Sequence, residues 1–407
     1  MKLMLNNPGY EKAQELLLMA VKPVKMEAVP LSQCCGRILA QVLIAQENVP
    51  AFDRSAYDGY ALRAEDTASA SKGSPVTLQI LEEISAGLTP TQNVVAGTAI
   101  KVLTGAPIPE GADVVVMYEK TNFTEKTVKL FSPLKAGDNV VRMGEDVQKG
   151  TLLAQSGTVI DPGLAGTLAA QGVVMPLVYK IPRVAILSTG SELVEADIVP
   201  EEGKIRNSNR YMLESALRQL GCEPVNLGIA GDSVMEISAL LNKGLAGCDA
   251  LITTGGVSVG DYDLVPAAME ESGIEVLFRG VDMKPGMACA YGTKDGKLIC
   301  GLSGNPASSL TNYYAVLLPA LRKLTGRRVY LSQEVQVTLS NGFSKKSPKT
   351  RFLRGMLELK NGVVCMEVPK AQGNVVLSSS IGCNVMAVVP EGSGSLDAGT
   401  VLKGFLL

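Results

Sequence analysis

Apolar and polar residues follow two different periods along the chain, and each change of period marks a new part. Residues 10–22 have apolar side chains at the 3.6-residue spacing of an amphipathic helix. From about residue 50 to 145 this period is lost, and short β-prone runs are separated by Gly and Pro, which predicts a small all-β module. The clearest of these runs are Val76–Ile80, Ala99–Leu103 and Val114–Tyr118.

From about residue 180, apolar runs alternate with glycine loops and helical patterns. Val184–Leu187 is a continuous apolar run, as expected of a strand that is buried on both faces. The order of strand, loop and helix predicts a largely parallel sheet with helices on both faces. The expected strands are 184–187, 225–229, 250–252 and 298–300, and the expected helices are 211–220, 234–245 and 307–324.

Two shorter patterns lie outside this region. Pro162 is placed to begin a short helix within residues 151–175. After residue 330 the chain becomes β-prone again, and residues 356–368 predict a hairpin with its turn at Lys360-Asn361-Gly362.

Composition limits the chemistry that is available. The 407 residues are enough for two to four domains, and the net charge of -2 gives no field that favours nucleic acid or an anionic membrane. The chain has 0 His, which excludes a Ser-His-Asp triad, a Cys-His dyad and His-ligated metal sites. Catalysis must therefore use carboxylates, Lys, Arg, hydroxyls, backbone amides or a bound metal.

Cysteine use and hydropathy indicate the compartment. None of the 8 Cys residues form a C-x-x-C pair, and most lie in apolar stretches where a thiol acts as a small hydrophobe. Free thiols are typical of a reducing compartment. The N-terminal region lacks the apolar stretch of a signal peptide, and no run reaches the roughly 18 residues of a spanning helix. We expect a soluble, cytoplasmic protein with no membrane partner.

Loops rich in Gly, Ser, Thr and acids follow the expected parallel strands. Ligands of open parallel sheets bind beyond the carboxyl ends of the strands, and glycine loops bring backbone N–H groups close to an anion. Asn305-Pro306 adds a cap and a first-turn proline at a helix start, where an anion is also favoured. Together the loops predict a nucleotide-phosphate site. Four carboxylates would meet there and suit Mg²⁺, namely Glu192, Asp232, Asp261 and Asp263.

Two further segments allow two interpretations each. Arg54–Ala61 contains an Asp-Gly turn that either joins two strands or carries function. Met283–Gly286 offers a cation in a rigid turn, or is a surface loop. The residue types alone do not decide between these interpretations.

Seven motifs, in this order, resemble those of the molybdopterin molybdenumtransferase family, which includes the E domain of gephyrin. They extend over nearly the whole chain, from about residue 10 to about residue 400 when their flanks are included. The motifs are Arg54–Leu62, Thr104–Asp113, Arg142–Asp146, Ser188–Leu193, Thr254–Asp263, Lys284–Gly286 and Gly301–Pro306.

The resemblance implies an elongated homodimer with four domains in each chain. The implied reaction inserts molybdate into adenylylated molybdopterin with the help of Mg²⁺, releases AMP and yields molybdenum cofactor. Molybdopterin adenylyltransferase is a possible partner. The implied domains are a linking domain of residues 1–49 and 145–178, an inserted β domain of 50–144, a molybdopterin-binding α/β domain of 179–328 and a C-terminal β-barrel-like domain of 329–407.

The resemblance also implies roles for individual residues. Glu192, Asp232 and Asp261 match the acidic residues of the pterin and metal cleft. Asp58 matches an aspartate of the β domain that faces the partner's cleft. Lys284, Pro285 and Ser303 match the oxyanion-side positions, and Arg354 matches the arginine of the last domain. The substrate-binding residues implied are Thr104, Ser188, Thr189, Gly190, Asn207, Gly255, Gly256, Ser258, Asp263, Pro285, Ser303, Asn305 and Ser378.

The chain departs from the family pattern in three places. Tyr57 stands where the family usually has Met, and Met287 stands where a second Lys often follows Lys-Pro-Gly. Gln372–Val375 replaces a Gln-Gly-Ser-His segment. Met287 and the missing histidine leave fewer evident cations for molybdate, of which Lys284 and Arg354 are the two we assign. The changes bear on the contacts to molybdate and not on the class of reaction, which needs a metal held by carboxylates and charged donors for the oxyanion.

Two other functions remain alternatives. A molybdopterin adenylyltransferase has a similar α/β fold and would use ATP, but it is a single domain, and the long β segments argue against it. A non-catalytic scaffold like gephyrin's E domain is the other alternative, and the complete acidic cluster argues for retained catalysis. An assay with adenylylated molybdopterin would separate the three.

Overall fold

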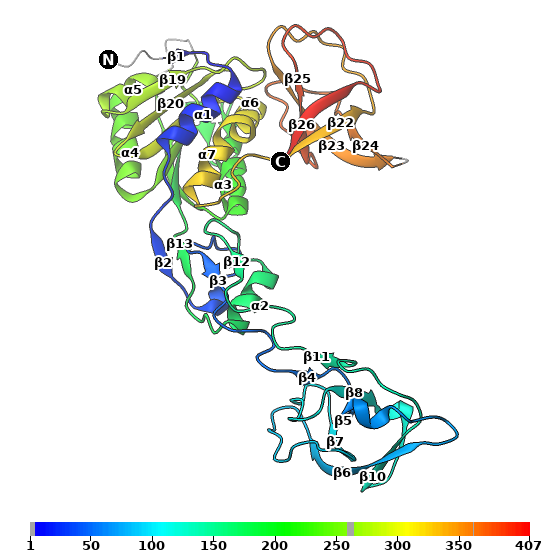
Figure 1. The fold of residues 1–407 in the computed structure, drawn as a ribbon. Helices are drawn as coiled ribbons and strands as arrows, with labels where there is room; N and C mark the ends of the chain where they lie inside the picture. Colours follow the sequence, from blue (N-terminus) through cyan, green and yellow to red (C-terminus); the bar gives the residue numbers. More distant parts are fainter. Residues whose placement is uncertain (1–4, 259–263, 361) are drawn as a thin grey trace. The chain divides into compact units, whose positions relative to one another are not determined.

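The computed structural model describes residues 5–258, 264–360 and 362–407. The chain divides into two compact units (Figure 1), of which the first comprises residues 1–41, 156–165 and 175–407 and the second 42–155 and 166–174. The expected linking segment is thus divided between the two units.

A seven-stranded sheet forms the centre of the first unit. Strands β14, β17, β18 and β21 run parallel, as predicted, whereas β20 runs antiparallel to both of its neighbours. The sheet is therefore mixed. In sheet order the strands are β1 (Leu5–Asn6), β19 (Glu275–Arg279), β20 (Cys289–Lys294), β21 (Lys297–Leu302), β18 (Ala250–Thr254), β14 (Arg183–Thr189) and β17 (Glu223–Ala230).

The antiparallel part of this sheet comes from a hairpin that the hydrophobic pattern did not predict. Asp295 and Gly296 join β20 to β21 and both have positive φ, +52° and +75°. Two such residues form the tight turn whose twist matches that of a hairpin. The Asp-Gly pair was a usable signal in the sequence, but the prediction considered only the apolar run after it.

Helices cover both faces of the sheet, and two separate cores lie beneath them. Val184 and Ile186 of β14 face one core, while Ala185 and Leu187 face the other, which confirms that this strand is buried on both sides. The first core lies under α1 (Tyr10–Ala20), α3 (Ser208–Leu220) and α7 (Leu318–Leu324), and the second under α4 (Val234–Gly247) and α5 (Val265–Glu271).

The helix expected over residues 307–324 is interrupted. It consists of α6 (Pro306–Asn312), a π-helical turn (Tyr313–Leu317) and α7. Pro319 explains the irregularity, because it has no N–H to donate to the carbonyl of Ala315. Gln14 of α1 supplies the missing donor, with its Nε2 2.6 Å from the Ala315 oxygen.

The last strands of the first unit close into a barrel. The hairpin predicted over residues 356–368 is present as the antiparallel pair β23–β24, although Asn361 of its turn lies outside the described residues. Phe352 of β23 packs edge-on against Tyr10 of α1 with ring centroids 5.1 Å apart, so the barrel shares the core of the α/β sheet. The barrel strands are β22 (Glu334–Leu339), β23 (Arg351–Lys360), β24 (Val363–Glu367), β25 (Val385–Val389) and β26 (Val401–Leu406).

The second unit contains the predicted β module. Its six-stranded sheet buries Tyr60, Leu62 and Val116 between β-branched neighbours. In sheet order the strands are β8 (Val114–Met117), β5 (Gly59–Leu62), β7 (Thr98–Val102), β6 (Val76–Ile84), β10 (Thr127–Leu130) and β9 (Thr121–Phe123).

Short elements complete the chain. The predicted short helix at Pro162 is present as α2 (Pro162–Ala170). The other short elements are paired strands, namely β2 (Met26–Ala28) with β13 (Leu177–Tyr179), β3 (Leu43–Ile44) with β12 (Leu152–Ala154), β4 (Arg54–Ser55) with β11 (Val140–Val141), and β15 (Leu193–Val194) with β16 (Ile205–Arg206).

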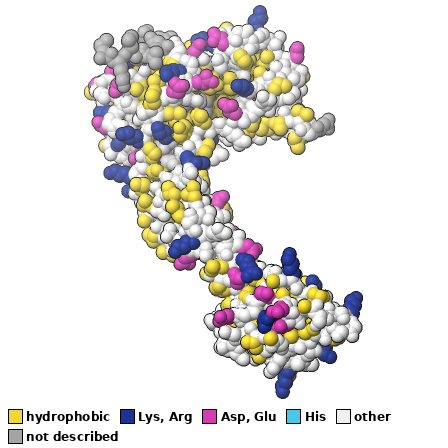
Figure 2. Space-filling model, in the orientation of Figure 1, with side chains coloured by type: hydrophobic (Ala, Val, Ile, Leu, Met, Phe, Trp, Pro, Cys, Tyr) yellow, Lys and Arg dark blue, Asp and Glu magenta, His cyan; other side chains and the backbone are white. Residues whose placement is uncertain are grey.

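On the face shown in Figure 2, acidic and basic side chains are interspersed, in keeping with the net charge of -2. None of the helices in the described part of the chain has the length and hydropathy needed to span a membrane.

The contact between Gln14 and Ala315 gives a first prediction. Gln14→Met keeps the length and helix propensity of the side chain but removes the donor, so the free energy of unfolding should fall by about 1–3 kcal/mol. Denaturant titration of the whole chain measures it. In a Pro319→Ala background the restored N–H can replace Gln14, and the same change should cost less. An equal loss in both backgrounds would contradict this explanation.

Candidate active site

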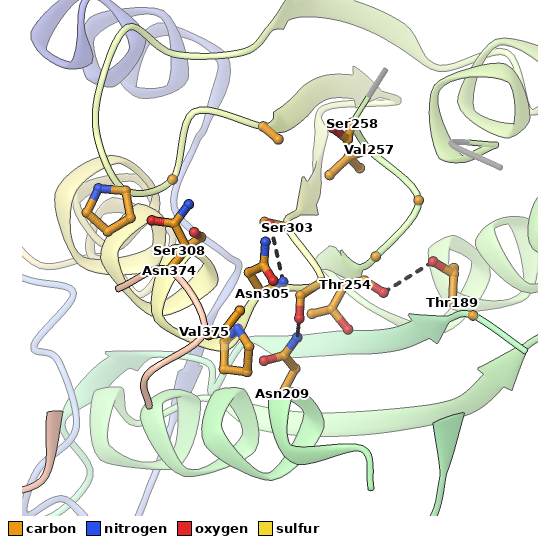
Figure 3. Close-up of a pocket in the computed structure, with 18 of the residues that line it drawn as sticks. Thr189, Asn209, Thr254, Val257, Ser258, Ser303, Asn305, Ser308, Asn374 and Val375 are labelled. Atoms are coloured by element: carbon orange, nitrogen blue, oxygen red, sulfur yellow. Dashed lines mark hydrogen bonds between the residues drawn. The ribbon is translucent and has the colours of Figure 1, made fainter. Parts of the chain in front are cut away.

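A pocket of about 970 Å³ lies at the carboxyl ends of the parallel strands in the first unit. This volume is in the range of sites that hold a cofactor-sized ligand. The loops after β14, β18 and β21 and the loop that leads into β20 line it. Figure 3 labels Thr189 at the end of β14, Ser258 after β18 and Ser303 after β21. Pro348, Lys349, Asn374 and Val375 of the barrel region complete it.

Most of the residues assigned to the site from sequence line this pocket. They are Thr189, Gly190, Glu192, Asn207, Asp232, Gly255, Gly256, Ser258, Lys284, Pro285, Ser303 and Asn305. Ser188 is fully buried next to them, where its hydroxyl accepts a 2.9 Å hydrogen bond from Nδ2 of Asn207.

The other assigned residues are not among the described residues that line the pocket. Arg354 and Ser378 are not among the residues that line the pocket. Asp58 and Thr104 belong to the second unit. Asp261 and Asp263 fall outside the described residues.

The glycine loops were expected to direct their amides at phosphate, but at Gly190 and Gly255 the amides are used within the protein. The N–H of Gly190 donates to the carbonyl of Ala230 at 3.2 Å, and the N–H of Gly255 donates to the carbonyl of Leu302 at 3.0 Å. Gly255 has φ of +93°, and a Cβ there would collide with the carbonyl oxygen of Thr189. At these two positions, therefore, glycine allows neighbouring loops to pack closely and does not present a free amide.

The start of α6 also differs from the expectation. Asn305 is the N-cap residue, but its side chain makes no capping hydrogen bond. The carbonyl of Asn374 instead accepts from the N–H groups of Ala307 and Ser308, at 3.1 and 3.3 Å. Figure 3 shows Asn374 and Val375 beside the first turn of α6. The helix start that was expected to attract an anion is thus capped by the barrel region.

The charged groups of the pocket lie at two poles. Glu192 and Asp232 follow β14 and β17, and both are exposed. Lys284 precedes β20, which is three strands away from β14 in the sheet order. With strands spaced about 4.8 Å apart, the ends of β14 and β20 are roughly 14 Å apart. The two carboxylates, with Arg206 of β16 (Ile205–Arg206) nearby, lie at one end of the pocket, which we call the acidic end, and Lys284 lies at the other, the basic end.

The basic end is held by main-chain pairing with the barrel. Lys284 donates its N–H to Thr350 at 2.9 Å and accepts from the N–H of Phe352 at 2.9 Å. Nδ2 of Asn312, which is 1% exposed, donates to the carbonyl of Gly286 at 2.8 Å. The hydroxyl of Tyr291 donates to Oδ1 of Asn312, and burial raises the pKa of Tyr291 well above its ordinary value, so this phenol remains a donor.

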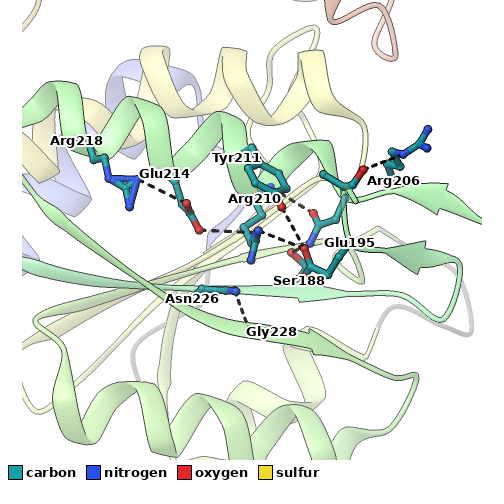
Figure 4. Close-up of polar contacts among 11 residues, drawn as sticks. Ser188, Glu195, Arg206, Arg210, Tyr211, Glu214, Arg218, Asn226 and Gly228 are labelled. Atoms are coloured by element: carbon teal, nitrogen blue, oxygen red, sulfur yellow. Dashed lines mark hydrogen bonds and ion pairs between the residues drawn. The ribbon is translucent and has the colours of Figure 1, made fainter. Parts of the chain in front are cut away.

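The acidic end is held by a chain of ion pairs on α3 (Figure 4). Arg210 pairs with Glu195 at 3.2 Å and with Glu214 at 3.7 Å, and Arg218 continues the chain to Glu214. Nζ of Lys204 donates to the carbonyl of Ser191 at 2.7 Å. The segment of residues 191–206 carries Glu192 and Arg206 to the pocket. The contact of Lys204 with Ser191 and that of Arg210 with Glu195 hold this segment in place.

Arg354 is a buried cation without a carboxylate partner among the described residues. It is 1% exposed, and its guanidinium donates to Ser379 at 3.0 Å and to Thr311 at 3.5 Å. Its Nε has no partner in the described part of the chain. Burial lowers the pKa of Arg354 from its ordinary value.

Asp58 and Thr104, which were assigned separately, are in contact within the second unit. Oδ1 of Asp58 accepts two hydrogen bonds, from the backbone N–H and from the hydroxyl of Thr104, both at 2.7 Å. These bonds stabilise the ionised form and lower the pKa of Asp58. Asp58 is therefore an exposed aspartate that stays charged below the pH at which an ordinary aspartate is protonated.

Three regions of the chain match family descriptions. Residues 9–172 match the MoeA N-terminal region (domain I and II), residues 185–323 match a probable molybdopterin binding domain, and residues 336–406 match the MoeA C-terminal region (domain IV).

Relatives and solved structures agree with these matches. The chain is 36% identical to a molybdopterin molybdenumtransferase of Bacillus subtilis over 95% of this chain and 91% of that protein. It is also 36% identical to one of Staphylococcus aureus, over 91% of this chain and 88% of that protein. The molybdopterin biosynthesis MoeA protein of Pyrococcus horikoshii is similar in structure, with a TM-score of 0.84, 31% identity and 98% of this chain and 99% of that chain covered.

The fold is that of a multidomain α/β protein with a β-barrel, and the matched regions indicate a molybdopterin-related substrate. The chain belongs to the molybdopterin molybdenumtransferase family. It is an enzyme of molybdenum cofactor biosynthesis that inserts molybdenum. The fold class, the family and the enzymatic function predicted from the sequence are confirmed.

The contact between Asp58 and Thr104 gives a second prediction. Thr104→Val removes the hydroxyl and leaves the amide donor, so the pKa of Asp58 should rise toward the ordinary aspartate value of about 3.9. A carboxyl ¹³C NMR titration measures this pKa. Because the pKa of Asp58 is lowered, the stability it contributes is present above the ordinary value and is lost as the pH falls through the lowered pKa. Thr104→Ser retains both donors and is the control, and an unchanged pKa in the valine variant would contradict the assignment.

Proposed function

We propose that the pocket binds adenylylated molybdopterin and molybdate together, and that cleavage of the phosphoanhydride releases AMP as molybdenum enters the pterin. The observation that supports this most is the separation of an acidic pole from a basic pole within one pocket. Two substrates that both carry negative charge require different counter-charges. The basic end suits a free oxyanion directly, while the acidic end suits phosphates through a divalent cation.

We propose Mg²⁺ as the ion at the acidic end, with Glu192, Asp232 and Asp261 as its ligands. The first two line the pocket and are exposed, so their oxygens are available, and carboxylates are the protein ligands that Mg²⁺ prefers. Mg²⁺ usually keeps several ligands that the protein does not supply, so water and phosphate oxygens of the substrate would complete the ligand set. When bound, Mg²⁺ would neutralise charge on the leaving phosphate.

We propose that Lys284, Pro285, Ser303, Ser378 and Arg354 form the oxyanion end. Lys284 and Ser303 supply donors from the pocket wall. Arg354 donates to Ser379, and its backbone N–H and C=O pair with the side chain of Gln372, which lies just before Asn374 and Val375. Its role is therefore proposed as positioning this segment, with its uncompensated positive charge adding to the field that attracts an anion.

We propose the substrate-binding role for the remaining pocket residues that the family motifs suggest. Thr189, Gly190, Asn207, Gly255, Gly256, Ser258 and Asn305 line the pocket between the two poles. Ser188 supports Asn207 through their hydrogen bond. Asp263 is proposed from its motif alone.

We propose that the enzyme is a homodimer in which Asp58 and Thr104 face the partner's pocket. Exposed apolar side chains on and beside the β2–β13 ribbon support a second copy, since Met26, Met175 and Ile181 are 52%, 52% and 46% exposed. Such patches often mark protein interfaces. The cytoplasm is the proposed compartment because all 8 Cys are free thiols. Molybdopterin adenylyltransferase, which produces the adenylylated substrate, is the proposed delivering partner.

A third prediction tests the acidic end. Glu192→Gln should reduce molybdate-dependent AMP release by about 100-fold and raise the Mg²⁺ concentration at half-maximal rate, because losing one carboxylate ligand costs several kcal/mol. The assay uses purified adenylylated molybdopterin with and without molybdate. Glu202→Gln removes the same charge outside the pocket and is the control. Full activity with an unchanged Mg²⁺ dependence would exclude Glu192 as a ligand.

A fourth prediction tests the shared site. Asp58→Asn and Glu192→Gln proteins should each be inactive, but a 1:1 mixture should recover about one quarter of the activity after subunit exchange, since half of the dimers are mixed and one site in each is intact. Mass spectrometry of the mixture verifies the exchange. If both residues served the same chain's site, mixed dimers would contain no intact site, and no activity would return.

A further inference from the structure

Lys349 lies at the basic end of the pocket, although no sequence motif indicated it. It lies two residues before β23 and lines the pocket together with Pro348. Its Nζ is 2.5 Å from Oδ1 of Asp282 and 3.6 Å from Sδ of Met287. Its side chain is 39% exposed, so it is only partly covered by the protein.

The backbone brings Lys349 next to Lys284. The N–H of Lys284 donates to the carbonyl of Thr350, the residue that follows Lys349. Of the basic residues in the described part of the chain, those that line the pocket are Arg206, Lys284 and Lys349. Arg206 is on β16 beside the segment of Glu192, where its Nε donates to the carbonyl of Ala196 at 3.0 Å. Lys284 and Lys349 are therefore the two cations of the basic end.

The ion pair with Asp282 does not prevent Lys349 from binding an anion. Both partners are about one-third exposed, at 39% and 33%. Ion pairs that are this accessible to water add little to stability. A doubly charged oxyanion at the pocket wall would compete effectively with a single, partly hydrated carboxylate for the same ammonium.

We propose that Lys349 is the second cation that binds the oxyanion substrate, acting together with Lys284. This rests on the proposed function, in which molybdate binds at the basic end. Asp282 then orients Lys349 in the empty pocket and releases it to the oxyanion. Arg354 is buried and does not line the pocket, so it acts on this end through its charge and its contacts and does not touch the substrate.

A structural alternative makes a different prediction. Lys349 belongs to the barrel region and Asp282 to the loop before β20. In the alternative, their ion pair serves only to hold these two segments together. In that case removal of either partner would have the same effect. If Lys349 binds the oxyanion, Asp282 is a competitor, and the two removals should have opposite or unequal effects on molybdate binding.

The experiment is a molybdate titration of AMP release, beside a direct titration of adenylylated molybdopterin binding, on the full-length protein. Lys349→Gln should raise the half-saturating molybdate concentration at least tenfold and change the affinity for the pterin less than twofold. Lys349→Arg should restore most of the molybdate affinity. Lys345→Gln removes the same charge from an exposed position on the same segment and should behave as wild type. Thermal unfolding midpoints show whether each variant is folded.

Asp282→Asn completes the test. It should leave the half-saturating molybdate concentration unchanged or lower it. A tenfold rise in Asp282→Asn as well as in Lys349→Gln would establish the fastening role and overturn the proposal, as would wild-type molybdate dependence in Lys349→Gln. If instead the wild-type enzyme releases AMP without any molybdate dependence, the proposed function fails, and this result is distinct from a failure at Lys349.

Discussion

The backbone pairing of Lys284 with Thr350 and Phe352 is the interaction on which the arrangement of the pocket depends. Two hydrogen bonds of 2.9 Å join a loop of the α/β region to the start of β23 in the barrel. Phe352 then buries its ring in the core of the α/β sheet against Tyr10. The barrel is therefore fixed to the pocket by the same residues that place Lys284, and the basic end of the site is built from both regions.

Buried polar groups around this pairing form hydrogen bonds that hold the pocket loops in place. Asn312 links the phenol of Tyr291 to the carbonyl of Gly286, so a position deep in the core controls the turn that follows Lys284. The carbonyl of Asn374 occupies the first free amides of α6. Burying these groups without partners would be costly, so the network favours one conformation of the turn and of the helix start.

The charged groups at the two ends of the pocket differ in how far they are buried. Glu192 and Asp232 are exposed and therefore suit a hydrated metal ion, whereas Arg354 is buried with hydroxyl partners and carries charge that its surroundings do not compensate. An exposed carboxylate keeps its charge in water, while a buried guanidinium acts over a longer distance because the low dielectric screens it less. This difference agrees with the proposal that one substrate binds through a metal ion and the other binds directly.

Local patterns in the sequence determined much of this structure. The apolar run at Val184–Leu187 predicted a strand buried on both faces, because alternate side chains of a strand point to opposite sides. The loops after the strands predicted the acidic end, because parallel strands bring their carboxyl ends to one edge. Tertiary structure alone decided the rest. Lys349 enters the pocket, Asn374 caps α6 and Gln14 replaces the donor that Pro319 lacks, and in each case the partners are distant in sequence. Such contacts depend on how separate segments pack together, and the hydrophobic period within one segment does not determine which distant residue it meets.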